Sequence, residues 1–274
     1  GAWVARFDGH DGHDVCGVSL SPAAPVVASA GSDGSVRVWG CSTQLCSETV
    51  GRALLPNDGT PDATELGCAE DIVAEDVGAR SPSTSIAGAD GVLPQTTHAR
   101  AHAGAINALA FCRGREGMDP LLVSCGADGE AKVWDCSREG MGELQTVFDG
   151  HGSSPVLAAC SEDGAGVGQC VYTASRDGVV LRWDAMHGAE RAMLVSHESR
   201  VQALATDAQG SLLASGDARG LLNLWEVAGG SLVTEPLTVA AAHADGIACL
   251  AFSSGGGIEG ATGTRLLASG ALDG

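Results

Sequence analysis

The stretch Asp128-Gly129-Glu130-Ala131-Lys132-Val133-Trp134-Asp135 decides the fold of this chain. An Asp-Gly turn leads into a short strand of alternating apolar and polar residues, and the strand ends in Trp. The same unit recurs at Asp33-Gly34…Trp39, Asp177-Gly178…Trp183, Arg219-Gly220…Trp225 and, without its Trp, at Asp273-Gly274. Recurrence at intervals of about 40 to 45 residues is typical of solenoid and propeller repeats.

Each copy of the unit carries further polar residues in register. A hydroxyl precedes the Asp (or Arg) by four residues, and a His stands upstream of both. The hydroxyl residues are Ser29, Ser124, Thr173, Ser215 and Ser269, and the histidines are His10, His102, His151, His197 and His243. Short apolar runs bounded by turn residues fill the rest of each copy, which predicts an antiparallel meander.

The repeat resembles the WD-repeat β-propeller family. Gly9-His10 and Gly150-His151 match the opening dipeptide of that family, and Trp134-Asp135 and Trp183-Asp184 match its closing dipeptide. The other copies keep only the His or only the Trp. The resemblance implies an all-β propeller of four-stranded antiparallel blades. The sequence accounts for about four to five blades of an incomplete ring.

The organisation of the chain follows from the positions of these copies. Residues 1–39 are predicted to hold the outer strand of a preceding blade and the first strands of the first blade. Residues 40–94 contain nine acidic and two basic residues and no sustained period, so we expect a disordered acidic insertion. Residues 95–274 hold the remaining blades, the last one truncated. The missing initiator Met and the end inside a repeat indicate a fragment of a longer protein.

The recurring polar residues are assigned a structural role by the family resemblance. In that family the His, Ser/Thr, Asp and Trp form a hydrogen-bonded tetrad that ties the loops of a blade to its strands. The chemistry fits, since the indole N–H is only a donor and a hydroxyl can both accept and donate. Such a network helps only when it is completely satisfied. Arg219 replaces the Asp in the fourth copy, so we expect that blade to lack the tetrad, with Asp217 as a partial substitute.

The competing interpretation of His, Ser and Asp is a hydrolase triad. A catalytic triad occurs once in a protein, whereas this set recurs in every repeat, and no Gly-x-Ser-x-Gly sequence accompanies it. The sequence therefore predicts no catalytic residues and no enzyme.

Two other groups of residues have alternative interpretations. His10 and His13 with Asp11 and Asp14 could form a metal site, although a stretch rich in Asp and Gly is more typical of a turn. Turn arginines could recognise carboxylate or phosphate, or could be solvated loop charges; these are Arg176, Arg200 and Arg219. No metal-binding or cofactor-binding residues are predicted.

The composition limits the classes of partner. The net charge of −19 disfavours nucleic acid and anionic membranes, which attract positive proteins, and is compatible with basic partners. No apolar run is long enough to span a membrane. The ten cysteines lack zinc-ligand spacing, so we expect free thiols and a cytoplasmic location, with the nucleus as the alternative.

The sequence therefore predicts a non-catalytic protein–protein interaction scaffold that belongs to a larger complex. Its expected partners are proteins or peptides, with basic ones favoured, and no cofactor is expected. The alternative is the propeller module of a multidomain enzyme or regulator whose catalytic domain lies outside this stretch. In the scaffold interpretation, the loops on the rigid frame of strands would bind the partners.

Overall fold

The computed structural model describes the chain in segments separated by gaps. The described residues are 10, 12–21, 26–40, 96–98, 101–112, 120–136, 142–162, 170–195, 197–228, 231–232, 236, 238–253 and 265–273. All regular structure in this part of the chain is β-strand. No helix in it is long and apolar enough to cross a membrane.

The first two blades are four-stranded antiparallel sheets whose strands follow one another in chain order. The first blade consists of β1 (Val15–Leu20), β2 (Val26–Gly31), β3 (Val36–Gly40) and β4 (Thr96–His98). The second consists of β5 (Ile106–Cys112), β6 (Leu121–Gly126), β7 (Ala131–Asp135) and β8 (Leu144–Phe148). In both, the Asp-Gly turn joins the second strand to the third.

The third blade repeats this order of strands, and the fourth and fifth follow it in part. The third blade consists of β9 (Val156–Ser161), β10 (Cys170–Ser175), β11 (Val179–Asp184) and β12 (Glu190–Val195). The fourth consists of β13 (Val201–Thr206), β14 (Leu212–Asp217), β15 (Leu221–Ala228), β16 (Ser231–Leu232) and β17 (Thr238–Ala241). In the fourth blade, β15 pairs with both β16 and β17. Two strands of the fifth blade are described, β18 (Ile247–Phe252) and β19 (Leu267–Ala271).

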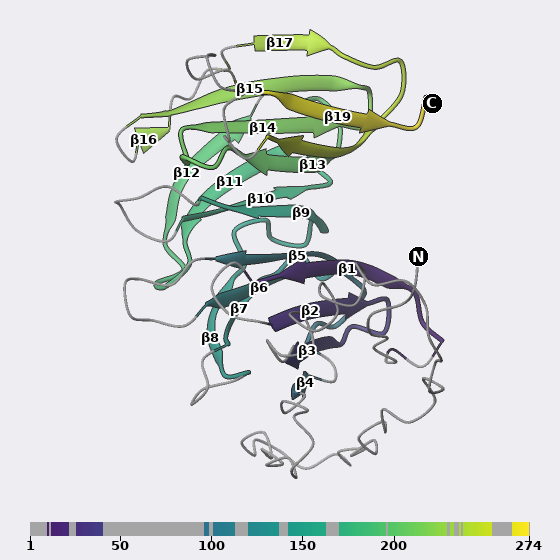
Figure 1. Ribbon diagram of the computed structural model, residues 1–274, viewed down its shortest axis with the longest axis vertical. Helices are drawn as coiled ribbons and strands as arrows, with labels where there is room; N and C mark the ends of the chain where they lie inside the picture. The colour runs from purple at the N-terminus through teal and green to yellow at the C-terminus, as the bar shows by residue number, and fades with distance from the viewer. Residues whose placement is uncertain are drawn as a thin grey trace, which may run out of the picture.

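The blades succeed one another in space as they do in sequence (Figure 1). The first strand of each blade contacts the first strand of the next, in the order β1, β5, β9, β13 and β18. Among the described residues, the first and fifth blades lie at opposite ends of the stack (Figure 1), so the ring is open. The architecture is an incomplete β-propeller, which confirms the predicted fold class.

The first strand of each blade, called the inner strand below, begins with a β-bulge, in which one residue is skipped in the pairing with the second strand. The skipped residues are Cys16, Asn107, Leu157, Gln202 and Ala248. The side chain of Asn107 donates from Nδ2 to the carbonyl oxygen of Val156 in the next blade, at 2.8 Å. The bulge therefore directs a side chain towards the neighbouring blade.

The hydrophobic core lies between consecutive blades rather than inside any one of them. One cluster joins the second and third blades and contains Val133, Phe148 and Trp183, all buried. Comparable clusters join the first blade to the second and the third to the fourth. A blade is a single sheet, and it buries its faces only against its neighbours.

Two regions predicted from the sequence lie largely outside the described residues. The outer strand of a preceding blade, predicted within residues 1–39, is not described, and of the acidic insertion 40–94 only Gly40 is described, as the last residue of β3. Directly after that insertion, β4 pairs with β3 and completes the first blade. The proposed division into 1–39, 40–94 and 95–274 remains a prediction.

Candidate functional site

One end of the blades, which we call the loop face, carries the turns and loops in which the recurring His and Asp of the repeat lie. It consists of the turn between the second and third strands of each blade and the His-containing loop before the first strand. The two parts are joined across blades: the backbone N–H of His102 donates to the carbonyl of Gly34, and that of His243 donates to the carbonyl of Gly220. The loop of one blade is therefore fixed to the turn of the blade before it.

The second blade has a complete tetrad. The indole Nε1 of Trp134 donates to Ser124 Oγ at 2.8 Å, and Ser124 Oγ lies 2.8 Å from His102 Nε2. On the other side of the ring, His102 Nδ1 lies 3.0 Å from the carboxylate of Asp128. The backbone N–H of Ala103 also donates to Asp128, at 3.0 Å. The tetrad thus connects β6, β7, the Asp-Gly turn and the His loop.

The direction of these hydrogen bonds follows from the donors. The indole N–H can only donate, so the hydroxyl of Ser124 donates onward to Nε2, and Nδ1 of a neutral His102 donates to Asp128. Burial lowers the pKa of His102 despite the neighbouring carboxylate. Burial alone would raise the pKa of Asp128, but the bonds from His102 and Ala103 outweigh it and hold that pKa below its usual value.

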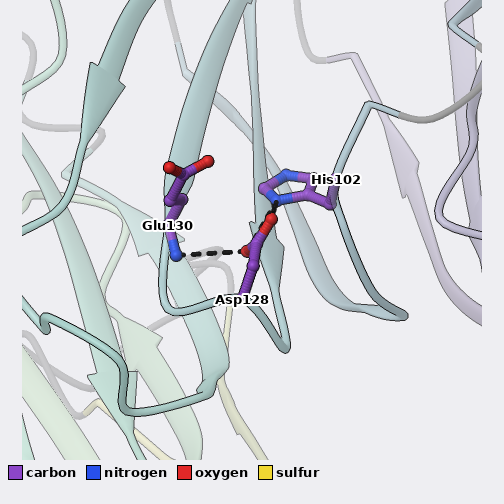
Figure 2. A group of neighbouring side chains, drawn as sticks. All are labelled: His102, Asp128 and Glu130. Atoms are coloured by element: carbon purple, nitrogen blue, oxygen red, sulfur yellow. Dashed lines mark hydrogen bonds and ion pairs between the residues drawn. The ribbon is translucent and has the colours of Figure 1, made fainter.

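His102, Asp128 and Glu130 lie close enough together to suggest a metal site. In Figure 2, Asp128 faces the His102 ring and the backbone nitrogen of Glu130, and the dashed lines run to these two groups and not to the Glu130 carboxylate. That carboxylate pairs with the ammonium group of Lys132 at 3.0 Å. Both ring nitrogens of His102 are engaged within the tetrad. The group is better explained as one tetrad and a neighbouring ion pair.

The first blade repeats the tetrad of the second. Trp39 Nε1 donates to Ser29 Oγ at 3.1 Å, and Ser29 Oγ lies 3.0 Å from His10 Nε2. His10 Nδ1 lies 3.1 Å from Asp33 Oδ2. The hydroxyl of Ser35 donates to the same carboxylate at 2.8 Å. This tetrad matches the prediction from the sequence.

The third blade has only part of the tetrad. His151 Nε2 lies 2.8 Å from Thr173 Oγ1, but His151 Nδ1 and Trp183 Nε1 are buried without a hydrogen-bond partner among the described residues. The carboxylate of Asp177 instead accepts from the hydroxyl of Ser175. The ring of Trp183 stacks on Phe148 of the second blade, with centroids 4.8 Å apart. Packing therefore holds Trp183 where hydrogen bonding does not.

The residue two positions after the hydroxyl explains the difference between blades. In the second blade this residue is Gly126, and a Cβ there would lie 2.4 Å from both His102 Nδ1 and Asp128 Oδ1. Gly31 has the same relation to His10 and Asp33 in the first blade. These glycines leave room for the His–Asp contact. In the third blade the position is Ser175, whose side chain enters that space and binds Asp177.

The fourth blade corrects an expectation. Arg219 does replace the usual Asp, but the blade keeps the rest of its tetrad because Asp217 occupies the position two residues after Ser215. Asp217 Oδ2 lies 3.3 Å from His197 Nδ1, poorly aligned for a hydrogen bond but close enough for electrostatic attraction. The Ser215 hydroxyl lies 2.8 Å from His197 Nε2 and accepts from Trp225 Nε1. The carboxylate has therefore moved to another position in the chain.

The fifth blade has the His, the hydroxyl and the Asp of the tetrad. His243 Nε2 lies 2.8 Å from Ser269 Oγ, and His243 Nδ1 lies 3.3 Å from Asp273 Oδ1. Ala271 stands where the first two blades have Gly. The longer His–Asp separation accompanies the added Cβ.

The environment of the hydroxyls argues against the hydrolase interpretation. Ser29, Ser124, Thr173 and Ser215 are all buried. In three of these blades the oxygen also accepts from the Trp indole. A nucleophile must reach its substrate, so these hydroxyls are placed for structure rather than for attack.

The alternative metal site near His10 has a similar explanation. Both ring nitrogens of His10 contact tetrad partners, and the backbone N–H of His13 donates to the carbonyl of His10 at 2.6 Å, which closes a tight turn. His13 and Asp14 are exposed, and Asp11 lies outside the described residues. The turn interpretation accounts for what is described.

The loop face contains an open hollow of about 640 Å³ between the first and second blades. Its lining residues are Ser32, Asp33, His102, Ala103, Gly104 and Lys132. Lys132 is already bonded there, since its Nζ donates to the carbonyl of Ala101 at 2.7 Å. The hollow has a fixed polar floor and an exposed rim formed by Ser32 and Ala103.

Stacked antiparallel blades with tetrads between loop and strand define a β-propeller repeat protein. The chain belongs to the WD domain, G-beta repeat family, whose repeats match residues 1–40, 94–135, 142–184 and 188–226. Repeats of this family are protein–protein interaction modules, and the resemblance seen in the sequence is confirmed.

Relatives and a solved structure extend the comparison. Telomerase protein component 1 of Mus musculus is 24% identical over 265 residues, 82% of this chain and 10% of that protein. Topless-related protein 4 of Arabidopsis thaliana is 32% identical over 83 residues, 30% of this chain and 7% of that protein. The chain thus spans a tenth or less of the length of these relatives. The computationally designed Ika4 protein is 29% identical with a TM-score of 0.46, covering 63% of this chain and 89% of its own.

Proposed function

We propose that this chain is a non-catalytic scaffold that docks protein or peptide partners on its loop face, as a module of a larger complex. The observation that carries the proposal is the repeated fixation of exposed loops to buried strands by the tetrads. In the second blade, for example, His102 and Ser124 are buried while Ala103 next to them is exposed. A loop held in this way keeps its shape before binding, which reduces the entropic cost of association.

The open hollow between the first and second blades offers room on the loop face for a partner side chain. The net charge of −19 supports a basic partner rather than a nucleic acid or an anionic membrane. Free cysteines in the described blades support a reducing compartment, the cytoplasm or the nucleus, as the proposed location. A fluorescent fusion of the full-length protein would test the location.

Docking can be tested by filling the hollow without touching a tetrad side chain. Ala103→Trp introduces bulk at the exposed rim, and Gln145→Trp introduces the same bulk on the exposed outer strand β8. We expect affinity purification of the full-length protein to lose its partners with Ala103→Trp and to keep them with Gln145→Trp. Equal recovery of partners by both variants, with both folded, would contradict docking at this hollow.

A second function deserves a test because the matched relatives are far longer than this chain. In that alternative the propeller is one module of a multidomain enzyme or regulator, and catalysis lies elsewhere. The full-length reading frame would show whether a catalytic domain is attached. Variants of His102 or Asp128 would then lower stability and leave the chemistry of that domain intact.

A further inference from the structure

Three arginines on the loop face of the third and fourth blades are exposed. They are Arg176, Arg200 and Arg219. The other arginines in the described segments are buried or paired at other places. Arg182 pairs with Glu162 at 2.9 Å, Arg191 with Asp184 at 2.7 Å, and Arg265 with Asp207 at 3.0 Å, while Arg37 is buried in the first blade.

The backbone segments that carry the three arginines touch one another. A Cβ at Gly178, two residues after Arg176, would lie 2.6 Å from the carbonyl oxygen of His197 and 3.0 Å from that of Ser199. The carbonyl of Arg200 accepts from the N–H of Ala218 at 3.0 Å, immediately before Arg219. The arginines therefore belong to one continuous region of the loop face, which we call the arginine sector.

The displaced carboxylate of the fourth blade explains why this region can carry Arg219. Asp217 supplies the charge next to His197, so the turn position that holds Asp33 or Asp128 in other blades is free for a different residue. The carboxylate of Asp217 is 2% exposed and accepts the backbone N–H groups of Arg219 and Leu221. It is therefore committed to the turn and does not cover the guanidinium groups.

The other carboxylates near the arginine sector leave its donors accessible. Asp177 accepts from Ser175 and from the backbone of Val179. Asp245, whose backbone packs against the turn at Gly220, accepts from the N–H of Gly246. Glu198 lies 3.1 Å from Arg219, with side chains 88% and 67% exposed respectively. An ion pair this exposed contributes little, so an incoming oxyanion can replace Glu198.

The same positions in the first blade have the opposite character. The residue before the inner strand is Asp14 there and Arg200 in the fourth blade. The turn residue is Asp33 there and Arg219 in the fourth blade. The loop face thus differs in charge between its first-blade end and the arginine sector, although the chain as a whole is strongly acidic.

We propose that the arginine sector binds an acidic linear segment of a protein partner through carboxylate or phosphate oxygens. The fork of N–H donors on a guanidinium matches the two oxygens of either group. This assignment rests on the proposed docking function of the loop face and names the chemistry of one partner segment. A basic region of the same or another partner would contact the acidic first-blade end.

The test uses the full-length protein and labelled Gly-Ser peptides that differ only in side-chain charge. One peptide carries several glutamates, the second carries glutamines at those positions, and the third carries phosphoserines. We expect the glutamate or the phosphoserine peptide to bind and the glutamine peptide not to bind. Tighter binding of the phosphoserine peptide identifies phosphate as the ligand, and equal binding identifies any oxyanion. Failure of both charged peptides overturns the proposal.

Charge reversal locates the binding. Arg219→Glu is expected to weaken the charged peptide about tenfold, because it removes a charge-assisted contact and adds repulsion. Arg191→Glu makes the same change in net charge at the other end of the third blade and should leave binding unchanged. Equal effects of the two variants would overturn the proposal, as would binding that does not weaken with salt. Arg219→Ala, a milder change, guards against misfolding of the reversal.

The outcome for the arginine sector is separable from that of the docking function. Loss of natural partners with Ala103→Trp but no effect of Arg219→Glu on peptide binding would reject the acidic ligand and keep the loop face as the docking surface. Loss of peptide binding with Arg219→Glu but no effect of Ala103→Trp on partners would keep the arginine sector and reject the hollow.

Discussion

The tetrads of the second and third blades use nearly the same residues and reach different hydrogen-bonding states. In the second blade every member of the tetrad has a partner, whereas in the third blade His151 Nδ1 and Trp183 Nε1 have none among the described residues. The local difference is Gly126 against Ser175. A position outside the tetrad thus decides whether the tetrad closes.

The comparison predicts unequal effects of the same substitution in the two blades. Asp128→Ala leaves His102 without an acceptor in a buried position, and we expect it to lower the free energy of unfolding by about 3 kcal/mol. Asp177→Ala removes only contacts within its own turn and should cost about 1 kcal/mol. Urea denaturation of the two variants measures both values. Equal losses would show that the third tetrad is closed in solution.

Substitutions at Gly126 and at Ser175 should change the stability of the protein in opposite directions. Gly126→Ala places a Cβ against His102 and Asp128, and we expect a loss of about 2 kcal/mol from the forced displacement. Ser175→Gly makes room for Asp177 to reach His151. We expect Ser175→Gly to raise the free energy of unfolding by about 1 kcal/mol, because the new bond to a charged group outweighs the cost of Gly in a strand.

The control for this exchange is Ser175→Ala, which removes the hydroxyl but keeps the Cβ. It should not be stabilising, since the space beside His151 stays filled. If Ser175→Ala stabilises the protein as much as Ser175→Gly does, the hydroxyl rather than the Cβ prevents closure. Thermal or urea unfolding distinguishes the three proteins.

The two tryptophans offer a smaller contrast. Trp134→Phe removes a donor to Ser124. Trp183→Phe removes an N–H that has no acceptor among the described residues, and it retains an aromatic ring against Phe148. We expect Trp134→Phe to be the more destabilising by about 1 kcal/mol. Equilibrium unfolding checks the difference. A larger loss for Trp183→Phe would show that its N–H is bonded in solution.

The histidines predict a modest dependence on pH. Burial lowers the pKa of His102, His151 and His197 below the usual 6.5. The unfolded chain therefore binds more protons between the two values, and stability should fall as the pH drops through 6.5.

His151→Gln isolates the contribution of the third blade to this pH dependence. The loss of stability on acidification should be smaller in the variant than in the unchanged protein. Urea denaturation on both sides of pH 6.5 measures it. An unchanged pH profile would mean that His151 does not titrate differently in the folded and unfolded states.

The sequence predicted the strands and the tetrad members because both depend on short, local spacing. The hydroxyl, the Asp-Gly turn and the Trp lie within one pair of neighbouring strands, so their separations repeat in every copy. The state of each tetrad could not be obtained in this way. It depends on the space beside a His that comes from a distant loop, which spacing does not describe.

The tetrads of the third and fourth blades differ from the first two because a different residue fills the space beside the His. The spacing of the repeat predicts the carboxylate at position 219, where the fourth blade has Arg, and it makes Asp217 only a partial substitute. The structure shows that a side chain two residues after the hydroxyl also reaches the His. The sequence does show that this position is Gly31 and Gly126 in the first two blades and Ser175 and Asp217 in the next two. Only the distances from this position to the His and Asp of the tetrad show why the change matters.

The bulge at the start of each inner strand has a consequence for how such a protein can change over evolutionary time. Asn107 bonds to Val156 in the next blade, and Gln202 reaches Gly246 in the blade after its own. The second and fourth blades thus each contain a joint to the following blade. Tandem duplication of one blade would bring a working joint with it, so the number of blades can grow in whole units without a new interface.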